Sequence, residues 1–475
     1  MGTTITTHEE IKNISINDLP DLLIGADTIV PTMHGQEKYI NFDNAASTPT
    51  FQPIADALVS FLKWYSNVHR GTGFKSQLAS WAFEKSRDMV ADFVNADLNK
   101  HVVIFTKNAT DAINKLSRQI NFSDDDIILT SLMEHHSNEL PWRRAGRVEH
   151  VQIDEDGCIS KDDFMAKIKE YGSRIKLVAI TGASNVSGYI TDIDFFARET
   201  HKIGAKIMLD GAQLVPHRPV DMKPNDPECY LDYLVFSAHK MYAPFGVGIL
   251  VSDNKTFEEG DPQEVGGGVV DIVTLEEAYW TDLPEKEEAG TPDIVGVVAL
   301  AKVIELFKSV GWKDIIDHES ELTAYALNKF NDIKGLTIYG DTDPANASNR
   351  LGVISINVDN VPHALVASIL SYEGGIGVRS GCFCAHIYVR TLLKVDIENC
   401  KTLKEEILAR DRSNLPGTIR ISFGIYNTKK EIDRLVEMLQ KIINGDYYKG
   451  YILNKEKGEY VPDNFELNFE DYYKI

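Results

Sequence analysis

The sequence predicts an α/β protein built on a mostly parallel sheet that helices cover on both faces. The first observation is a series of short apolar segments rich in β-branched residues, which is typical of strands buried on both faces. The second is that amphipathic segments alternate with them, as crossover helices do between parallel strands. The third is a length of 475 residues, 43% of them hydrophobic, which is enough chain for a second, smaller α+β domain.

The strands of the main sheet are expected between residues 102 and 251. Amphipathic helices are expected over residues 80–95 and 194–203, where apolar side chains recur at helical spacing with charged residues opposite them. The predicted strands, in chain order, are VVIFT, DIILTS, KLVAIT, KIMLD, YLVFSAH and VGILV.

The sequence pattern also predicts how the chain divides into domains. We expect an N-terminal arm at 1–40 that joins the small domain, a large domain at 41–295, the small domain at 296–445 and an acidic, aromatic tail at 446–475. The tail could be a docked strand or a contact for a partner. Within the small domain the pattern predicts helices over 297–310, 318–332 and 429–443, and strands over 336–340 and 352–358.

Composition excludes several classes of function. The net charge of −22 disfavours a nucleic-acid partner, because phosphate backbones are bound by clustered Lys and Arg. No segment approaches the ~18 consecutive apolar residues of a membrane span, and the first residues are too polar for a secretory signal. Five cysteines show no disulfide spacing, which predicts free thiols and a cytoplasmic protein.

Polar residues that end the apolar segments are the candidates for chemistry, because ligands bind beyond the carboxyl ends of parallel strands. Asp210 ends one predicted strand and Lys240 follows another, a pair that could also be a buried ion pair. Thr110, His135 and Asn185 follow other strands. Together they supply what pyridoxal phosphate requires, namely an amine, a carboxylate, a flat ring and donors for its phosphate.

Eight motifs in a fixed order connect these residues to a known family. They are NFDNAAST (41–48), SNVHRG (66–71), MEHHSNELPW (133–142), SNVSGYI (184–190), LDGAQLVPH (209–217), SAHKMYAPFGVG (237–248), EAGTP (288–292) and VRSGCFCA (378–385). From about residue 40 to 440 the chain resembles the class V aminotransferases, which are fold type I pyridoxal-phosphate enzymes, and within them the type II cysteine desulfurases and selenocysteine lyases.

The resemblance implies the fold of the aspartate-aminotransferase large domain and a role for each matching residue. Lys240 would form the Schiff base, Asp210 would hold the pyridine nitrogen, and His135 would stack on the ring and shuttle protons. The remaining implied contacts are Gln213 to the phenolic oxygen, Asn185 to cofactor and substrate, Ala109, Thr110, Ser237 and His239 to the phosphate, Thr291 to the phosphate of the neighbouring subunit, and Asn44 and Arg379 to the substrate carboxylate. A homodimer follows.

The loop with two cysteines bears on the reaction. Cys384 falls at the position of the persulfide cysteine, five residues after Arg379, whereas Cys382 stands where the best-known type II enzymes have a histidine. Cys382 could relay sulfur, form a regulatory disulfide, or be a small buried apolar residue. The spacing of these cysteines and His386 is not that of common zinc sites, so no metal is predicted.

The resemblance therefore predicts a cysteine desulfurase that converts L-cysteine to L-alanine and passes the sulfur to Cys384. The alternatives are another reaction with the same cofactor, such as a selenocysteine lyase, C–S lyase, epimerase or aminotransferase, and a non-catalytic scaffold. The expected partners are a small amino acid, a second copy of the chain and a sulfur-acceptor protein.

Overall fold

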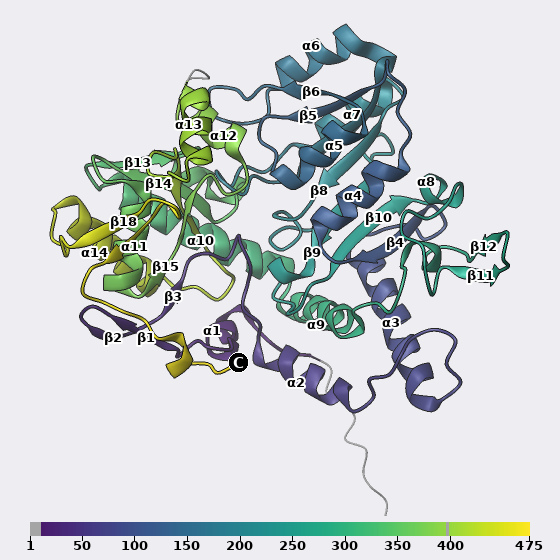
Figure 1. The fold of residues 1–475 in the computed structure, drawn as a ribbon, viewed down its shortest axis with the longest axis horizontal. Helices are drawn as coiled ribbons and strands as arrows, with labels where there is room; N and C mark the ends of the chain where they lie inside the picture. Colours follow the sequence, from purple (N-terminus) through teal and green to yellow (C-terminus); the bar gives the residue numbers. More distant parts are fainter. Residues whose placement is uncertain (1–10, 396–398) are drawn as a thin grey trace, which may run out of the picture.

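A computed structural model describes residues 11–395 and 399–475, arranged as two lobes that each contain a sheet (Figure 1). The larger sheet has seven strands in the order β4-β10-β9-β8-β7-β5-β6. Strand β10 runs antiparallel to both of its neighbours, and the other neighbouring pairs are parallel. The strands are β4 (His101–Thr106), β5 (Ile127–Ser131), β6 (Arg147–Val151), β7 (Ile175–Thr181), β8 (Lys206–Asp210), β9 (Tyr233–Ser237) and β10 (Gly248–Asp253). The predicted fold class is confirmed.

All six strand segments expected in this sheet are present, and sequence reasoning missed only β6. That strand lies at the edge of the sheet, and four of its five residues are exposed or half-buried. Because so little of β6 is buried, its sequence RVEHV lacks the continuous apolar character of the other strands, including β4 at the opposite edge.

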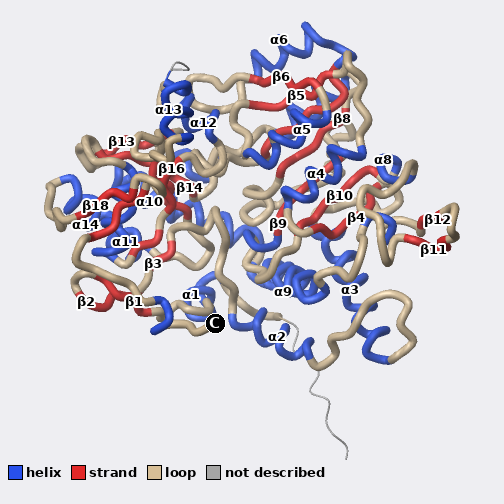
Figure 2. The backbone as a smooth tube through the Cα atoms, in the orientation of Figure 1, coloured by secondary structure: helices blue, strands red, loops and turns tan. Residues whose placement is uncertain are grey.

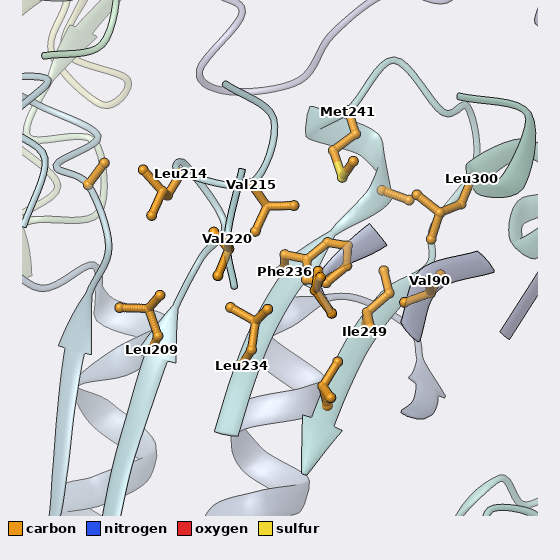
Figure 3. Close-up of a cluster of buried hydrophobic side chains, with 14 of the residues drawn as sticks. Val90, Leu209, Leu214, Val215, Val220, Leu234, Phe236, Met241, Ile249 and Leu300 are labelled. Atoms are coloured by element: carbon orange, nitrogen blue, oxygen red, sulfur yellow. The ribbon is translucent and has the colours of Figure 1, made fainter. Parts of the chain in front are cut away.

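Helices cover both faces of this sheet because alternate residues of each strand point to opposite sides. Leu234 and Phe236 of β9 join the apolar cluster on one face, and Val235 between them joins the cluster on the other. Figure 3 shows the first cluster, where Val90 and Leu300 meet the strand residues. The helices of this lobe are α2 (Gln52–Leu62), α3 (Phe74–Phe93), α4 (Ala109–Gln119), α5 (Leu140–Ala145), α6 (Lys161–Tyr171), α7 (Ile193–Lys202), α8 (Lys255–Glu258) and α9 (Ile294–Val310).

The second lobe contains a four-stranded antiparallel sheet in the order β13-β14-β17-β16. Figure 2 shows this sheet separated from the larger one by helices and loops. The helices and strands expected after residue 296 are found, although the helix expected over 318–332 begins six residues earlier, at Trp312. The strands are β13 (Leu336–Tyr339), β14 (Val353–Val358), β16 (Arg379–Gly381) and β17 (Thr418–Ser422); the helices are α10 (Trp312–Asn331), α11 (His363–Gly374), α12 (His386–Leu392), α13 (Asn399–Leu408) and α14 (Lys429–Ile443).

A hairpin near each end of the described chain packs on α11 of this second lobe, whereas Ile14 donates its backbone N–H to Ser309 of α9 in the large lobe. After the short helix α1 (Leu19–Leu22), β1 (Ile29–Thr32) and β2 (Gly35–Lys38) form a hairpin, and β3 (Ile40–Asn41) pairs with β15 (Ile376–Gly377). The C-terminal residues form a second hairpin, β18 (Tyr451–Asn454) with β19 (Glu459–Pro462), whose Tyr460 carbonyl accepts a hydrogen bond from Ser368 of α11 at 2.8 Å. A third hairpin, β11 (Val270–Val273) with β12 (Ala278–Trp280), projects from the large lobe (Figure 1).

No helix within the described ranges combines the length and apolar character needed to cross a bilayer.

A buried carboxylate connects the two lobes. Glu319 of α10 accepts a hydrogen bond from the backbone of Gly352 at 2.9 Å, and Nδ1 of His217 lies 2.8 Å from its carboxylate. Arg218 contacts the same carboxylate. Burial alone would raise the pKa of Glu319, but these partners outweigh it and lower the pKa to about 2.

We expect Glu319→Gln to lower the free energy of unfolding by about 3–5 kcal/mol, because it leaves Arg218 buried without its counter-ion. A carboxyl with a lowered pKa stabilises the fold above its unfolded pKa, near 4.5, and that contribution is lost as the pH falls toward about 2. The difference between wild type and variant should therefore shrink over this range in urea denaturation. A difference independent of pH, or an equal effect of Glu437→Gln on the exposed side of α14, would contradict this account.

Candidate active site

The carboxyl ends of the parallel strands open into a cavity of about 480 Å³ that lies between the two lobes. Thr181, Asp210 and Ser237 end β7, β8 and β9 on one wall. Arg379 of β16 and Arg420 of β17 lie on the opposite wall. All but two of the predicted site residues line this cavity, namely Ala109, Thr110, His135, Asn185, Asp210, Gln213, Ser237, His239, Lys240, Arg379 and Cys384.

Lys240 and Asp210 define the chemical centre of the cavity. Burial lowers the pKa of Lys240 to about 8, although the charge of Asp210 opposes this shift. A larger fraction of its amine is therefore neutral near physiological pH, as a nucleophilic lysine requires. Burial also raises the pKa of Asp210, which the Lys240 charge and a 3.0 Å hydrogen bond from the Ala212 backbone counteract. The carboxyl of Asp210 is suited to pair with a cationic ring nitrogen, and the amine of Lys240 is suited to react with a carbonyl group.

The N-terminus of α4 supplies a cradle for an anion. The side chain of Asn108 caps the helix, and the Ala109 backbone N–H donates to Oγ of Ser237 at 2.8 Å. Gly248 of β10 allows the close approach, since a Cβ there would stand 2.2 Å from the carbonyl carbon of Asn108. Backbone N–H groups at a helix N-terminus bind phosphate well. The cavity thus fits the phosphate of pyridoxal phosphate.

His135 presents a neutral, flat ring to the same cavity. Burial, with a smaller contribution from Lys240, lowers the pKa of His135 to about 3. Its Nδ1 accepts a hydrogen bond from the Ser137 backbone at 3.1 Å, which fixes the orientation of the ring. An uncharged imidazole can stack on an aromatic ligand without the cost of a buried charge.

Glu134 lies behind His135, and sequence reasoning did not identify it. Its carboxylate is buried and accepts hydrogen bonds from Asn138 at 2.7 Å and from the Thr181 backbone at 3.1 Å. Burial raises the pKa of Glu134 to about 8 against the effect of these donors. The contacts join the loop of His135 to the end of β7. Its place directly before the histidine pair was the only available signal.

Cys384 lies in a constrained loop at the mouth of the cavity. Phe383 and Cys384 have φ values of 50° and 54°, a left-handed conformation that costs energy for residues other than glycine. The His136 N–H donates to the Cys384 carbonyl at 2.7 Å, and the Asn185 amide donates to the Phe383 carbonyl at 2.8 Å. These contacts hold an exposed Cys384 against the cavity wall.

Cys382 has the opposite surroundings. Its thiol donates to the carbonyl of Pro416 at 3.0 Å, and it packs against the main apolar cluster. Burial raises the pKa of the Cys382 thiol to about 11. Cys382 does not line the cavity, which favours the buried apolar interpretation over a sulfur relay.

Asn44 and Thr291 are not among the residues that line this cavity. The Asn44 amide is buried and committed to other groups, since it donates to the Ser422 carbonyl at 3.0 Å and accepts from the Tyr426 hydroxyl at 2.7 Å. Thr291 lines a separate cavity of about 870 Å³ together with His69 and Arg70. Their roles toward substrate and neighbouring subunit stay predictions.

Arg420 is a second residue, besides Glu134, that sequence reasoning missed. It is buried on β17, donates to the Asn185 carbonyl at 3.2 Å, and has an Nε that finds no hydrogen-bond partner in the described structure. A guanidinium on the wall of a cavity can bind an anionic ligand. An arginine between two isoleucines in TIRIS (418–422) was the available signal.

We expect alkylation at pH 8 to modify Cys384 well before Cys382. A thiol with a pKa of about 11 is only about 0.1% thiolate at that pH, whereas Cys384 is exposed. Peptide mass spectrometry after a short iodoacetamide treatment measures both sites. Equal labelling of the two cysteines in the folded protein would show that the loop opens.

Comparison with known proteins places these features in a family. The family model for Aminotransferase class-V matches residues 40–435. A probable cysteine desulfurase of Halalkalibacterium halodurans is 33% identical, covering 85% of this chain and 92% of that protein. A cysteine desulfurase of Haloferax volcanii is 31% identical, covering 88% and 92%.

Solved structures of similar fold also include cysteine desulfurases. The apo structure of a cysteine desulfurase from Thermococcus onnurineus NA1 has a TM-score of 0.76 at 29% identity, covering 90% of this chain and 98% of that one. The cysteine desulfurase CsdA of Escherichia coli, in an S-sulfonic acid form, has a TM-score of 0.72 at 25% identity, covering 86% and 95%. With the family match extending over most of its length, this chain belongs to the class V aminotransferase family.

Proposed function

We propose that this protein is a pyridoxal-phosphate-dependent cysteine desulfurase, which converts L-cysteine to L-alanine and retains the sulfur on Cys384. The observation that carries the proposal is an exposed thiol on the wall of the cavity that also contains Lys240 and two arginines. The curated relatives reported above carry the names cysteine desulfurase and probable cysteine desulfurase. Of the two cysteines in the loop, only Cys384 lines the cavity, and one thiol there is enough for this reaction.

The cavity residues would hold the cofactor in the way that their surroundings allow. Lys240 would anchor its aldehyde, Asp210 its ring nitrogen, and His135 the face of its ring. Gln213, which donates to the Ala45 carbonyl at 2.7 Å, would lie near its phenolic oxygen, and the donors at the start of α4 would take its phosphate. When bound, pyridoxal phosphate withdraws electrons from the α-carbon of an amino acid and so makes its proton acidic.

The remaining chemistry falls to side chains of this chain. Arg379 and Arg420 would bind the substrate carboxylate, and the amine of Lys240 would move the α-proton. The Cys384 thiolate would attack the substrate sulfur, so that a sulfur–sulfur bond forms while the carbon–sulfur bond breaks. The electron pair of that bond stays with the β-carbon, which is then protonated, and alanine and an enzyme persulfide result.

Further expectations concern assembly and location. Thr291 lines a cavity other than the one that contains Lys240, which suits a residue that completes the site of a second copy in a homodimer. A sulfur-acceptor protein would then take the persulfide sulfur from the exposed Cys384. Free cysteines without disulfide spacing support a cytoplasmic location.

Incubation with a panel of amino acids tests the proposed reaction. We expect L-cysteine to yield alanine, and we expect Cys384→Ala to lose alanine formation while Cys382→Ala keeps most of it. Alanine, sulfide, pyruvate and keto acids are measured together, because pyruvate would indicate elimination and keto acids transamination. Full activity of a double variant that lacks both cysteines would reject the persulfide and favour another reaction with the same cofactor.

Replacement of the anchoring amine tests the cofactor site separately. We expect Lys240→Ala to reduce alanine formation by about 10²–10⁴-fold, the usual contribution of a positioned base. The variant should also lose its visible cofactor absorbance on dialysis against a competing amine. Lys202→Ala, an exposed lysine paired with Glu199, serves as the control. Retention of the bound chromophore by Lys240→Ala would contradict the assignment.

A further inference from the structure

One carboxylate connects the two arginines of the cavity wall. Oδ2 of Asp43 lies 2.7 Å from Nη2 and 3.0 Å from Nε of Arg379. Oδ1 of the same carboxylate lies 2.9 Å from Nη2 of Arg420. Asp43 therefore forms ion pairs with both guanidinium groups at once, one through each oxygen.

The backbone explains why a carboxylate is needed there. Arg379 of β16 and Arg420 of β17 are direct cross-strand partners in the antiparallel sheet. Like charges directly opposite each other destabilise such a pair of strands. The segment after β3 brings Asp43 to this point, because β3 pairs with β15 and the chain then bridges from Asp43 to Ser422 of β17.

The charges of this cluster do not balance. Two guanidinium groups share one carboxylate, and neither arginine forms another ion pair within the described residues. Burial lowers the pKa of Arg420 while Asp43 raises it, so the buried cation depends on this carboxylate. One positive charge remains without a counter-ion at the wall of the cavity, which matches a ligand with a single carboxylate.

The bonds to Asp43 determine how the two guanidinium groups are oriented for that ligand. Arg379 directs its Nε and Nη2 edge toward Asp43, which leaves Nη1 outside these contacts on a side chain that lines the cavity. Arg420 also lines the cavity, and its bonds to Asp43 and to the Asn185 carbonyl orient its guanidinium. Arg379 is 52% exposed, and a long exposed side chain loses rotamer freedom when it binds a ligand. An anchor that orients it beforehand reduces that loss.

We propose that Asp43 is a positioning residue that orients Arg379 and Arg420 for the α-carboxylate of the substrate. Asp43 itself does not touch the substrate, and its effect is exerted through the two guanidinium groups. This inference rests on the proposed function, since it deepens how the same cavity would select amino acids that carry a free carboxylate.

The test compares Asp43→Asn with wild-type holoenzyme, using two ligands that each lack one group of L-cysteine. 3-Mercaptopropionate has the carboxylate without the amine, and cysteamine has the amine without the carboxylate. We expect the Kd of 3-mercaptopropionate, measured by calorimetry, to rise about tenfold or more, as for a lost charged hydrogen bond. The Kd of cysteamine should stay unchanged, and the KM for L-cysteine should rise more than kcat falls.

Two further variants exclude a general loss of structure. Asp43→Glu keeps the charge at a changed distance and should bind 3-mercaptopropionate with intermediate affinity. Asp226→Asn removes a carboxylate paired with the surface residue Arg198 and should change neither ligand. Equal weakening of both ligands in Asp43→Asn would show a purely structural role, and unchanged or tighter binding of 3-mercaptopropionate would overturn the proposal. If wild type binds both ligands but forms no alanine, the proposed reaction fails while these comparisons still decide the role of Asp43.

Discussion

The carboxylate of Glu319 is buried at the junction of the two lobes, where a charge is tolerated only if its partners compensate for the lost water. His217 and Arg218 come from the loop after β8, and Gly352 comes from the start of β14. Because these partners belong to different sheets, the ion pairs fix how the lobes face each other. The cavity depends on this arrangement, since Lys240 and Asp210 lie on one side of it and Arg379, Cys384 and Arg420 on the other.

Burial then determines the ionisation of the groups inside the cavity. The same loss of solvent lowers the pKa of Lys240 and His135 and raises the pKa of Asp210. The result is an amine that is partly neutral, an uncharged ring and a buried carboxyl whose raised pKa is opposed by the Ala212 backbone and the Lys240 charge. This combination is what a carbonyl cofactor with a cationic ring nitrogen requires.

The cysteine loop shows how backbone contacts separate two similar residues. Cys382 and Cys384 differ by two positions in the sequence, yet the left-handed turn at Phe383 directs one thiol toward Pro416 and places the other at the cavity. The hydrogen bonds from His136 and Asn185 stabilise this strained turn. The different exposure of the two thiols therefore follows from where each one lies. The sequence distinguished them only through the family resemblance, which matched Cys384 to the persulfide cysteine.

The sequence by itself determined the α/β class, the central strands and the residues at their carboxyl ends, because buried parallel strands leave a continuous apolar pattern and end in polar residues at one edge. Ordered motifs were enough to select Lys240, Asp210, His135 and Cys384 as candidates. Only the tertiary structure decided the edge strand β6, the antiparallel direction of β10, the hydrogen bonds that commit Asn44 to Ser422 and Tyr426, and the pairing of Asp43 with Arg379 and Arg420. These features arise from contacts between segments up to several hundred residues apart. The local sequence pattern does not determine which distant group a side chain contacts.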